Sequence, residues 1–458
     1  MNDLIHTYER LKEPGSEWLG RIPRQWRVKR LKFLVSCLGG GTPNTGNPEF
    51  WGGHIPWVSP KDMKSALISA TEDYLTELGV ESSATSIIKP GAVLVVVRSG
   101  ILRHSIPVAR NVVSVALNQD MKALIPFGEL SSDYLYWIIE GNQKQLLPLW
   151  SKSGCTVESI ELDYMLNTKI PLPTLPEQQT ITRFLDFKTA QIDALIAKKQ
   201  ALLDKLAEKR TALISHAVTK GLVPSVPMKD SGVAWLGEIP AHWERMLMAR
   251  VISAFEQGWS PSCDEREASE EEWGVLKSGC VNYGVFQERE HKTLPASIDP
   301  IPSLEVKAGD ILMCRASGSK HLIGSVALVK KCRPKLMFSD KTYRVSLQSA
   351  MIDSEFFVLV MRSKYLREQI ELSISGADGL ANNIPQSSVK AYQVVIPPLD
   401  EQQIIAVTLQ KKIESMDTQE KKIAKAIGKL QEYRSALITN AVTGKIDVRA
   451  WQPNQEAA

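Results

Sequence analysis

Two stretches of the chain are nearly alike, and together they decide its fold. Residues 175–219 read LPEQQTITRFLDFKTAQIDALIAKKQALLDKLAEKRTALISHAVT. Residues 399–443 read LDEQQIIAVTLQKKIESMDTQEKKIAKAIGKLQEYRSALITNAVT. The two stretches align without a gap at an offset of 399 − 175 = 224. No proline or glycine falls between Glu177 and Thr219, where Ala, Leu, Lys, Glu and Gln predominate, so each copy is predicted to form one long helix.

Apolar residues recur every seven positions in both copies, with Lys199 interrupting the first. These residues are Leu185, Ile192, Leu206 and Leu213 in the first copy, and Leu409, Met416, Ile423, Leu430 and Leu437 in the second. Leu195 and Leu202 are expected at the intermediate core positions. A heptad pattern predicts a coiled coil, so we expect the two sets to pack against each other as a helix–helix core. About 40 residues at 1.5 Å each would give a rod of roughly 60 Å.

A second repeat precedes each long variable stretch. Residues 18–26 read WLGRIPRQW and residues 235–243 read WLGEIPAHW, at an offset of 235 − 18 = 217. Because tryptophan contributes a large buried area in small domains, the four residues Trp18, Trp26, Trp235 and Trp243 are expected to be buried anchors. Gly221 and Gly444, just past the two long helices, are expected to stop them.

The stretches between the repeats, about 27–170 and 244–395, are far less alike but share a skeleton. The turns 89–91 and 307–309 precede apolar runs at 92–97 and 311–314, which we predict to be buried strands. Segments 134–139 and 356–361 are predicted to be short amphipathic helices. Each stretch is long enough for one α/β (α+β) core, so the chain is predicted to be an internal duplication of a globular domain and a helix.

Composition narrows the class of protein. The chain has 458 residues, of which 43% are hydrophobic and 23% charged, which is typical of globular proteins and excludes disordered and collagen-like classes. The net charge of +4 does not by itself identify a nucleic-acid binder. The longest apolar run is too short for a membrane helix, and the N-terminus lacks a signal-peptide core, so a cytoplasmic protein is expected. Six cysteines without a C-x-x-C pair are expected to be reduced thiols.

Polar loops in the variable stretches hold the residue types that contact DNA. Arg or Lys can bind guanine and Asn or Gln can bind adenine, whereas Ser, Thr and Tyr can bind phosphates. The DNA-binding candidates of the first stretch are Thr42, Asn44, Thr45, Ser59, Lys61, Arg98, Ser99, Arg103, Asn118, Gln119, Lys152 and Ser153. Those of the second are Lys277, Ser278, Asn282, Tyr283, Arg315, Ser317, Ser319, Lys320, His321, Lys341, Asn382 and Asn383. For any single residue, the alternative is an ordinary solvated loop position.

Catalytic motifs are missing from the sequence. It has no G-x-x-x-x-G-K-[ST] phosphate loop and no H-x-x-x-H pair of metal ligands. The segment Asn47-Pro-Glu-Phe50 differs from the Asn-Pro-Pro-Tyr/Phe motif of amino-methyltransferases, because a glutamate replaces the second proline. Asp299 with Glu305 and Lys307 is superficially similar to a metal-dependent nuclease, although Lys307 is better explained as a turn residue. We therefore expect no catalytic residue and no metal site.

Two unlike domains, each closed by a near-identical helical block, resemble the specificity (S) subunit of type I restriction–modification systems. The resemblance rests on W-L-G-x-I-P-x-x-W twice and on L-x-E-Q-Q with A-L-I-[ST]-x-A-V-T twice. It implies a first target-recognition domain at 1–174, a spacer helix at 175–221, a second target-recognition domain at 222–398, a spacer helix at 399–445 and a tail at 446–458. The helices would pack antiparallel, with a pseudo-two-fold internal repeat.

The resemblance also implies a role and partners. Each domain would read one half of a bipartite site in double-stranded DNA, and the helices would fix the gap between the halves. Two methyltransferase (M) subunits would supply S-adenosylmethionine and adenine N6 methylation, and restriction (R) subunits would supply ATP- and Mg²⁺-dependent cleavage. This chain would hold no cofactor and would not be an enzyme. Candidate docking residues for the M subunits are Gln178, Gln179, Arg210, Gln402, Gln403 and Arg434.

Two other functions remain open from the residues alone. A self-contained metal-dependent endonuclease would cut DNA with Mg²⁺ and would lose this activity on Glu305→Ala. A protein-interaction scaffold would retain no specific DNA even with its partners present.

Overall fold

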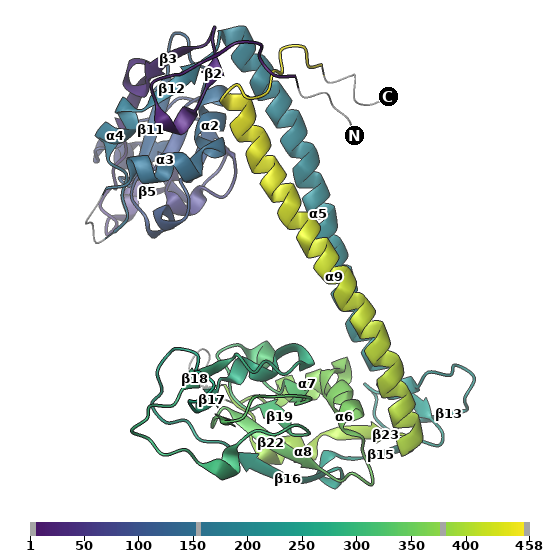
Figure 1. Ribbon diagram of the computed structural model, residues 1–458. Helices are drawn as coiled ribbons and strands as arrows, with labels where there is room; N and C mark the ends of the chain where they lie inside the picture. The colour runs from purple at the N-terminus through teal and green to yellow at the C-terminus, as the bar shows by residue number, and fades with distance from the viewer. Residues whose placement is uncertain (1–5, 153–156, 376–381, 453–458) are drawn as a thin grey trace. The chain divides into compact units, whose positions relative to one another are not determined.

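The computed structural model describes residues 6–152, 157–375 and 382–452, and the chain divides into two compact units. Unit 1 comprises Met1–Lys199 and Lys425–Ala458, and unit 2 comprises Gln200–Ala424. Two long helices, α5 (Leu175–Lys220) and α9 (Leu399–Val442), belong to both units, because each helix has one part in unit 1 and the other part in unit 2 (Figure 1). The repeated stretches therefore do form long helices, and the predicted mixed helix-and-strand fold with an internal repeat is confirmed.

Unit 1 is built on an antiparallel sheet with one short parallel edge. Its sheet order is β4-β11-β8-β9-β6, beside a three-stranded sheet β10-β5-β7 and the two-stranded pairs β12-β3 and β1-β2. The strands are β1 Leu11–Lys12, β2 Ile22–Pro23, β3 Arg27–Arg30, β4 Val35–Gly39, β5 Trp51–Val58, β6 Leu67–Ile68, β7 Asp73–Leu75, β8 Val93–Val96, β9 Val108–Asn111, β10 Ala116–Leu117, β11 Met121–Pro126 and β12 Lys169–Leu172. The shorter helices are α1 Glu77–Glu81, α2 Ser132–Gly141, α3 Gln143–Trp150 and α4 Leu162–Asn167.

Among the described residues, unit 2 repeats this arrangement without a counterpart of the parallel edge strand β6. Its sheets are β16-β22-β19-β20 and β18-β17-β21, with the pairs β15-β23 and β13-β14. The strands are β13 Met228–Asp230, β14 Glu238–Pro240, β15 Glu244–Leu247, β16 Ile252–Gln257, β17 Gly274–Leu276, β18 His291–Thr293, β19 Ile311–Cys314, β20 Val326–Leu328, β21 Leu336–Met337, β22 Thr342–Leu347 and β23 Gln393–Ile396. The helices are α6 Ser354–Arg362, α7 Lys364–Ser373 and α8 Gln386–Ala391. Apart from β6, the variable stretches thus share one topology.

The two predicted core strands are present and central. All four residues of β8 are buried, as are all four of β19, and each strand is paired on both sides. A central strand with both faces covered reads as a continuous apolar run, which explains why these runs stand out in the sequence. The turn before each strand places its glycine, Gly91 or Gly309, at a φ of 96°.

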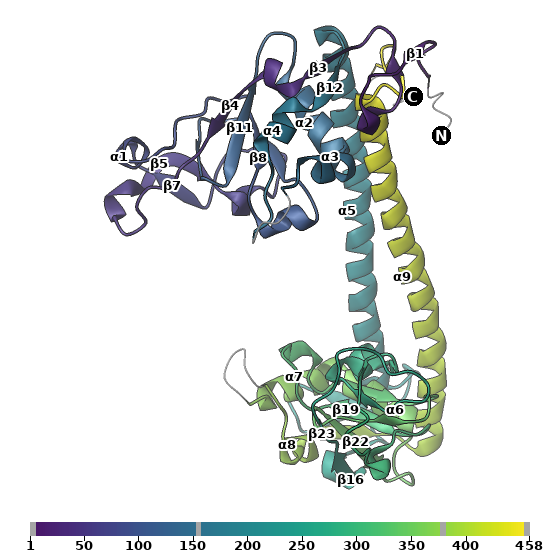
Figure 2. The same ribbon diagram turned by 60° about the vertical axis from the view of Figure 1, so that its left-hand side comes forward.

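The prediction of amphipathic helices at 134–139 and 356–361 is wrong in one respect. Helices α2 and α6 do form there, but every side chain of both segments is buried. In unit 1, α2 and α3 lie between the sheet and α5, so α2 has no solvent-facing side along this segment (Figure 2). A helix that is apolar on all sides is buried on all sides.

In each unit, part of α5 packs against part of α9. Leu185, Ile192 and Leu437 belong to the core of unit 1, with Leu430 packed against it. Leu409 belongs to the core of unit 2, with Leu213 packed against it. Met416 is buried, whereas Leu206 and Ile423 are half-buried. In unit 1 the first part of α5 thus packs against the last part of α9. In unit 2 the last part of α5 packs against the first part of α9, so the helices run antiparallel.

The prediction that Leu195 and Leu202 occupy the intermediate core positions of α5 is wrong by one residue. Leu195 and Leu202 are exposed, whereas Ile196 and Leu203 are half-buried. Ile196 packs against the core of unit 1. From Leu185 onward, buried positions follow one another at intervals of four and then three residues. The next core positions are therefore 189, 192 and 196. The sequence offered a leucine at both of the adjacent positions, and only packing distinguishes them.

The helices end as predicted at glycines in the left-handed region. Gly221 has a φ of 79° and Gly444 a φ of 71°, which glycine adopts without the steric cost of a Cβ atom. Gly444 also lies against Pro23, because an added Cβ would fall 2.2 Å from the Pro23 Cδ atom. No helix among the described residues is long and apolar enough to cross a membrane.

Candidate nucleic-acid interface

One hydrogen bond joins the two repeated motifs in each unit. The Trp26 indole donates to Glu177 Oε1 at 2.9 Å, and the Trp243 indole donates to Glu401 Oε2 at 3.0 Å. Both rings are fully buried, so the prediction of buried anchors holds for these two. It fails for Trp235, which is 46% exposed and stacks on Tyr365, and Trp18 is half-buried. The second tryptophan of W-L-G-x-I-P-x-x-W therefore anchors each domain to the glutamate of L-x-E-Q-Q.

The first glutamine of L-x-E-Q-Q fixes the start of a domain helix. Gln178 accepts from the Ser131 N–H at 2.9 Å and donates to the Glu129 carbonyl at 2.7 Å. Gln402 accepts from the Asp353 N–H at 2.8 Å and donates to the Met351 carbonyl at 2.9 Å.

Ser131 and Asp353 are the N-cap residues of α2 and α6. Both glutamines are completely buried, so their prediction as partner-docking residues is wrong. Of the remaining docking candidates, Gln179 and Gln403 are exposed.

Arg210 and Arg434 link the two long helices. They are equivalent by the offset of 224. Arg434 Nε bonds to Asp193 at 2.9 Å, and Arg210 forms an ion pair with Asp417. Because Asp417 is itself 224 residues after Asp193, the two ion pairs are equivalent under the internal repeat. Both side chains are half-buried and already paired within the chain, and their role as docking residues stays a prediction.

The first set of DNA-binding candidates gathers where β8 and β11 meet the loops of unit 1. Thr42 hydrogen-bonds to Gln119, and the backbone of Arg98 pairs with that of Ser159. The Ser99 N–H donates to the Glu158 carbonyl, and the Lys152 N–H donates to the Ser159 carbonyl. Three loops far apart in the sequence therefore meet at one end of the sheet. Asn44 and Thr45 lie exposed on the loop that carries Thr42.

Carboxylates neutralise the cations of this region. Arg98 pairs with Asp120 at 2.7 Å and Arg103 with Glu158 at 3.1 Å. Lys152 lies 3.6 Å from Glu161 and Lys61 lies 2.8 Å from Asp73. All four cations remain solvent-exposed, so these pairs contribute little to stability. The exposed surface of this region therefore consists of ion-paired side chains and polar loops.

Two of the first set are internal structural residues. Ser59 is 4% exposed and donates its hydroxyl to Asp62 in a capping box. Asn118 is 9% exposed and its Oδ1 accepts from the Asp120 N–H at 2.6 Å. Because both side chains are buried and used locally, their prediction as DNA contacts is wrong. Ser153 lies outside the described residues.

Six of the second set line one cavity of about 390 Å³ in unit 2. They come from four loops and share polar or cationic side chains: Ser278, Arg315, Ser317, Lys341, Asn382 and Asn383. Ala316 and Gly318 complete the lining. The sequence predicts each of these loops as a DNA-binding candidate. It does not predict that the four loops meet, because they are far apart in the chain.

The other candidates of the second set lie elsewhere on unit 2. Ser319, Lys320 and His321 are exposed at the start of a short 3₁₀ helix. Lys277 and Asn282 are half-buried, and Tyr283 is 69% exposed. The next residue, Gly284, lines a different cavity of about 60 Å³ with α6 and α9, so this turn faces the long helix.

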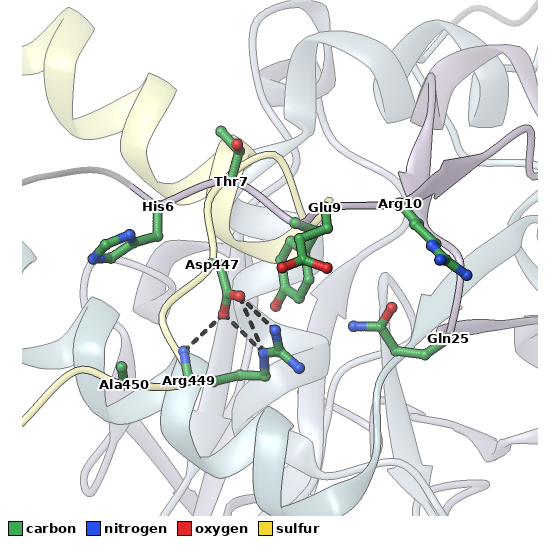
Figure 3. A pocket seen from close by; sticks show the side chains of 9 residues that line it. His6, Thr7, Glu9, Arg10, Gln25, Asp447, Arg449 and Ala450 are labelled. Carbon is green, nitrogen blue, oxygen red and sulfur yellow. Dashed lines mark hydrogen bonds and ion pairs between the residues drawn. The ribbon is translucent and has the colours of Figure 1, made fainter.

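The chain's two terminal segments form a site that the sequence did not indicate. In unit 1 the Asp447 N–H donates to the His6 carbonyl at 2.7 Å, and Arg449 pairs with Asp447 at 2.6 Å (Figure 3). A cavity of about 710 Å³ opens beside them, lined by His6, Thr7, Tyr8, Glu9, Arg10, Gln25, Asp447, Arg449 and Ala450. Tyr8 donates to Glu177 at 2.7 Å, so this segment reaches the same carboxylate as Trp26.

The residues of the nuclease-like pattern have structural partners. Glu305 Oε1 accepts from the Lys335 N–H at 2.8 Å, and Lys335 has a φ of 61° that this bond helps to hold. The Lys307 N–H donates to Asp310 at 2.9 Å in the turn before β19. No cluster of three or more His, Cys, Asp or Glu side chains that could hold a metal ion occurs in the described parts of the chain. Cys37, Cys263, Cys280, Cys314 and Cys332 are free thiols.

Comparison with known proteins identifies the family. The family model described as "Type I restriction modification DNA specificity domain" matches residues 23–205 and 286–427, which is more than half of the chain. The Escherichia coli type I restriction enzyme EcoR124I/EcoR124II specificity subunit is 43% identical over 159 residues, which is 34% of this chain and 39% of that protein. The Methanocaldococcus jannaschii type I restriction enzyme MjaIX specificity subunit is 24% identical over 94% of this chain and 95% of that one.

A solved structure has the same fold. A chain from the work on complex assembly and conformational transition of the type I restriction–modification system superposes with a TM-score of 0.62. The match covers 93% of this chain and 99% of that chain at 16% identity, which shows the fold alone. The repeated Trp–Glu and Gln contacts, the duplicated domains and the family match lead to one conclusion: this chain belongs to the type I restriction–modification DNA specificity domain family.

Proposed function

We propose that this chain is the DNA sequence-recognition subunit of a type I restriction–modification complex. Each globular domain reads one half of a bipartite site in double-stranded DNA, and α5 and α9 set the spacing between the halves. The observation that carries this proposal is the duplication itself. The same buried tryptophan and glutamine contacts attach two domains of different surface chemistry to equivalent helices.

The partners and cofactors follow from the same proposal. Two methyltransferase subunits dock on this chain and supply S-adenosylmethionine and adenine N6 chemistry, and restriction subunits add ATP and Mg²⁺. The target adenine leaves the base stack into a pocket of the methyltransferase. The specificity subunit itself contributes recognition and no catalysis, and the complex acts in the cytoplasm.

Distinct surfaces at equivalent places support two separate readers. In unit 1, Arg98 is paired with Asp120, whereas the equivalent region of unit 2 contains Arg315 and Lys341 around an open cavity. Two domains of the same topology with different side chains at the same loops are expected to prefer different base sequences, because base edges are read by side-chain hydrogen bonds.

The test is a map of N6-methyladenine across the genome of a host that expresses this chain with its methyltransferase subunit. The proposal expects a two-part motif with a fixed gap. Exchange of residues 27–170 for those of a relative should change one half of the motif and leave the other half and the gap unchanged. A continuous motif, or a motif unchanged by the exchange, would contradict the two-reader assignment. If the chain binds partner proteins specifically and the host DNA carries no methylation, the alternative function as a protein-interaction scaffold would be favoured.

A further inference from the structure

An arginine follows the central strand in both units, one position later in unit 1 than in unit 2. Arg98 follows β8 and Arg315 follows β19. The Val97 N–H donates to the Asp120 carbonyl at 2.8 Å, and the Arg315 N–H donates to the Lys341 carbonyl at 2.8 Å, so Arg315 is equivalent to Val97. Arg98 is the next residue along, and its equivalent in unit 2 is Ala316. Asp120 and Lys341 each directly precede the neighbouring strand, β11 or β22, so they are structurally equivalent. The two sites therefore differ in the position of the arginine by one residue, and unit 1 has a carboxylate where unit 2 has an ammonium group.

This difference changes what each arginine can bind. Arg98 Nε is held by the Asp120 carboxylate at 2.7 Å, which neutralises its charge. Arg315 Nε instead donates to the Tyr343 hydroxyl at 3.0 Å, and its Nη1 donates to the Asp340 carbonyl at 3.2 Å. Neutral groups thus orient the Arg315 guanidinium without pairing its charge. A guanidinium has five N–H donors, so three remain for a ligand.

The tyrosine that holds Arg315 is itself fixed. The buried Tyr343 hydroxyl donates to the Ile384 carbonyl at 3.3 Å, and the Ile384 N–H donates to the Arg315 carbonyl at 3.0 Å. The Arg315 guanidinium also lies 5.8 Å from the centre of the Tyr343 ring. The arginine is therefore pre-oriented before any ligand arrives, which lowers the entropic cost of forming a specific contact.

An acceptor lies in the same cavity. Asn382 is 3% exposed and lines the cavity with Arg315, and its Oδ1 has no hydrogen-bond partner within the described residues. The Asn382 carbonyl accepts from the Ser317 N–H at 3.4 Å, which places this segment beside the loop that follows Arg315. Buried acceptors without partners are rare and costly, and this one lies in the wall of a polar cavity, so a turn of the Asn382 side chain would present it to a donor of a ligand.

We propose that this cavity reads a G·C base pair in the half-site of the second domain. Arg315 donates to guanine O6 and N7, and Asn382 Oδ1 accepts from the cytosine N4 amino group. Two acceptors beside one donor is the pattern that G·C presents in the major groove. An A·T pair places the adenine N6 donor where Arg315 needs an acceptor. The assignment rests on the proposed function and names the base pair that one of its two readers selects.

The experiment measures methylation of duplex oligonucleotides by the complex of this chain with its methyltransferase subunit. Each position of the second half-site is varied in turn. Arg315→Gln is expected to lower the preference for G over other bases at one position by roughly 5- to 150-fold. Preferences at the other positions should not change. Asn382→Ala is expected to weaken the preference at the same base pair. This second variant tests the same assignment if the Arg315→Gln chain does not fold.

Two control variants define the outcome. Lys307→Gln removes a cation at the opposite end of β19, so the base preferences should match those of the unmodified chain. Arg98→Gln should alter the first half-site only. An equal loss of methylation on every sequence for Arg315→Gln would show a phosphate contact and overturn the proposal. A change confined to the first half-site would also overturn it. The absence of any two-part motif in the unmodified chain would instead contradict the proposed function.

Discussion

The junctions between domain and long helix in the two units differ at one charged position. In unit 1, Arg434 lies between Asp193 of α5 at 2.9 Å and Glu140 of α2 at 3.5 Å. In unit 2, the equivalent Arg210 pairs with Asp417 and, at 3.0 Å, with Glu420, both from α9. The repeated block supplies one carboxylate in both units, but the second carboxylate comes from the domain in unit 1 and from the helix in unit 2.

The reason is a reversed charge on the domain helix. Aligning the N-caps Ser131 and Asp353 places Arg362 of α6 where α2 has Glu140. Burial and the neighbouring Arg210 lower the pKa of the Arg362 guanidinium. Glu420 is aligned with Ile196, so the second copy of the helix carries a charge that the first does not need. A variable domain is therefore matched to its helix through this position, and exchange of a domain alone can place two like charges together.

The largest predicted effect tests what the two junctions share. Trp26→Ala and Trp243→Ala should each lower the free energy of unfolding by about 3–5 kcal/mol, because each removes a fully buried ring. Chemical unfolding of the full chain measures this. Trp→Phe at the same positions keeps most of the ring volume and removes the indole donor to Glu177 or Glu401, so a smaller loss is expected. A loss at only one of the two sites would show that the junctions are not equivalent.

A smaller effect tests what differs. Glu140→Arg should destabilise unit 1 by about 1–2 kcal/mol, because it places a second guanidinium beside Arg434. Ile196→Glu alone should also lower stability, because Ile196 packs against the core of unit 1. In the double variant the new carboxylate copies Glu420 of unit 2, so the double variant should lose less than the sum of the two single losses. Thermal unfolding of the two single variants and the double variant gives the coupling between the sites. If the losses add without any recovery, the role assigned to Glu420 is wrong.

The smallest effect concerns pH and is confined to unit 1. Burial, donation of its hydroxyl to Glu177 and the charge of that carboxylate all raise the pKa of Tyr8. A raised pKa means that this stabilisation is present below the ordinary tyrosine pKa of about 10 and is lost as the pH rises above it. Tyr8→Phe should therefore show a shallower fall in stability above about pH 10. Urea unfolding at several pH values measures the slope, and an unchanged slope would contradict the assignment.

Periodicity and repetition predicted the long helices, the two central strands and the buried Trp26 and Trp243, because each depends on local pattern. The predictions that failed concern which side of an element is covered. Gln178, Gln402, Arg210 and Arg434 are candidates for docking partner subunits from the sequence, but they contact a domain or the other helix. Polar residues at buried junctions look like surface residues in a sequence, since their partners come from distant segments.

The sequence by itself determined the duplication, the helix bounds near 175–220 and 399–442, and the family, because these rest on repeated residues and local propensity. Only the tertiary structure decided that the four strands of the main sheet in unit 2 follow the same order as four of the five in unit 1, and that four loops meet around Arg315. Backbone pairing fixes a topology with many different side chains, so similar folds need not leave similar sequences. The convergence of loops depends on contacts between residues up to about a hundred positions apart, which no local pattern encodes.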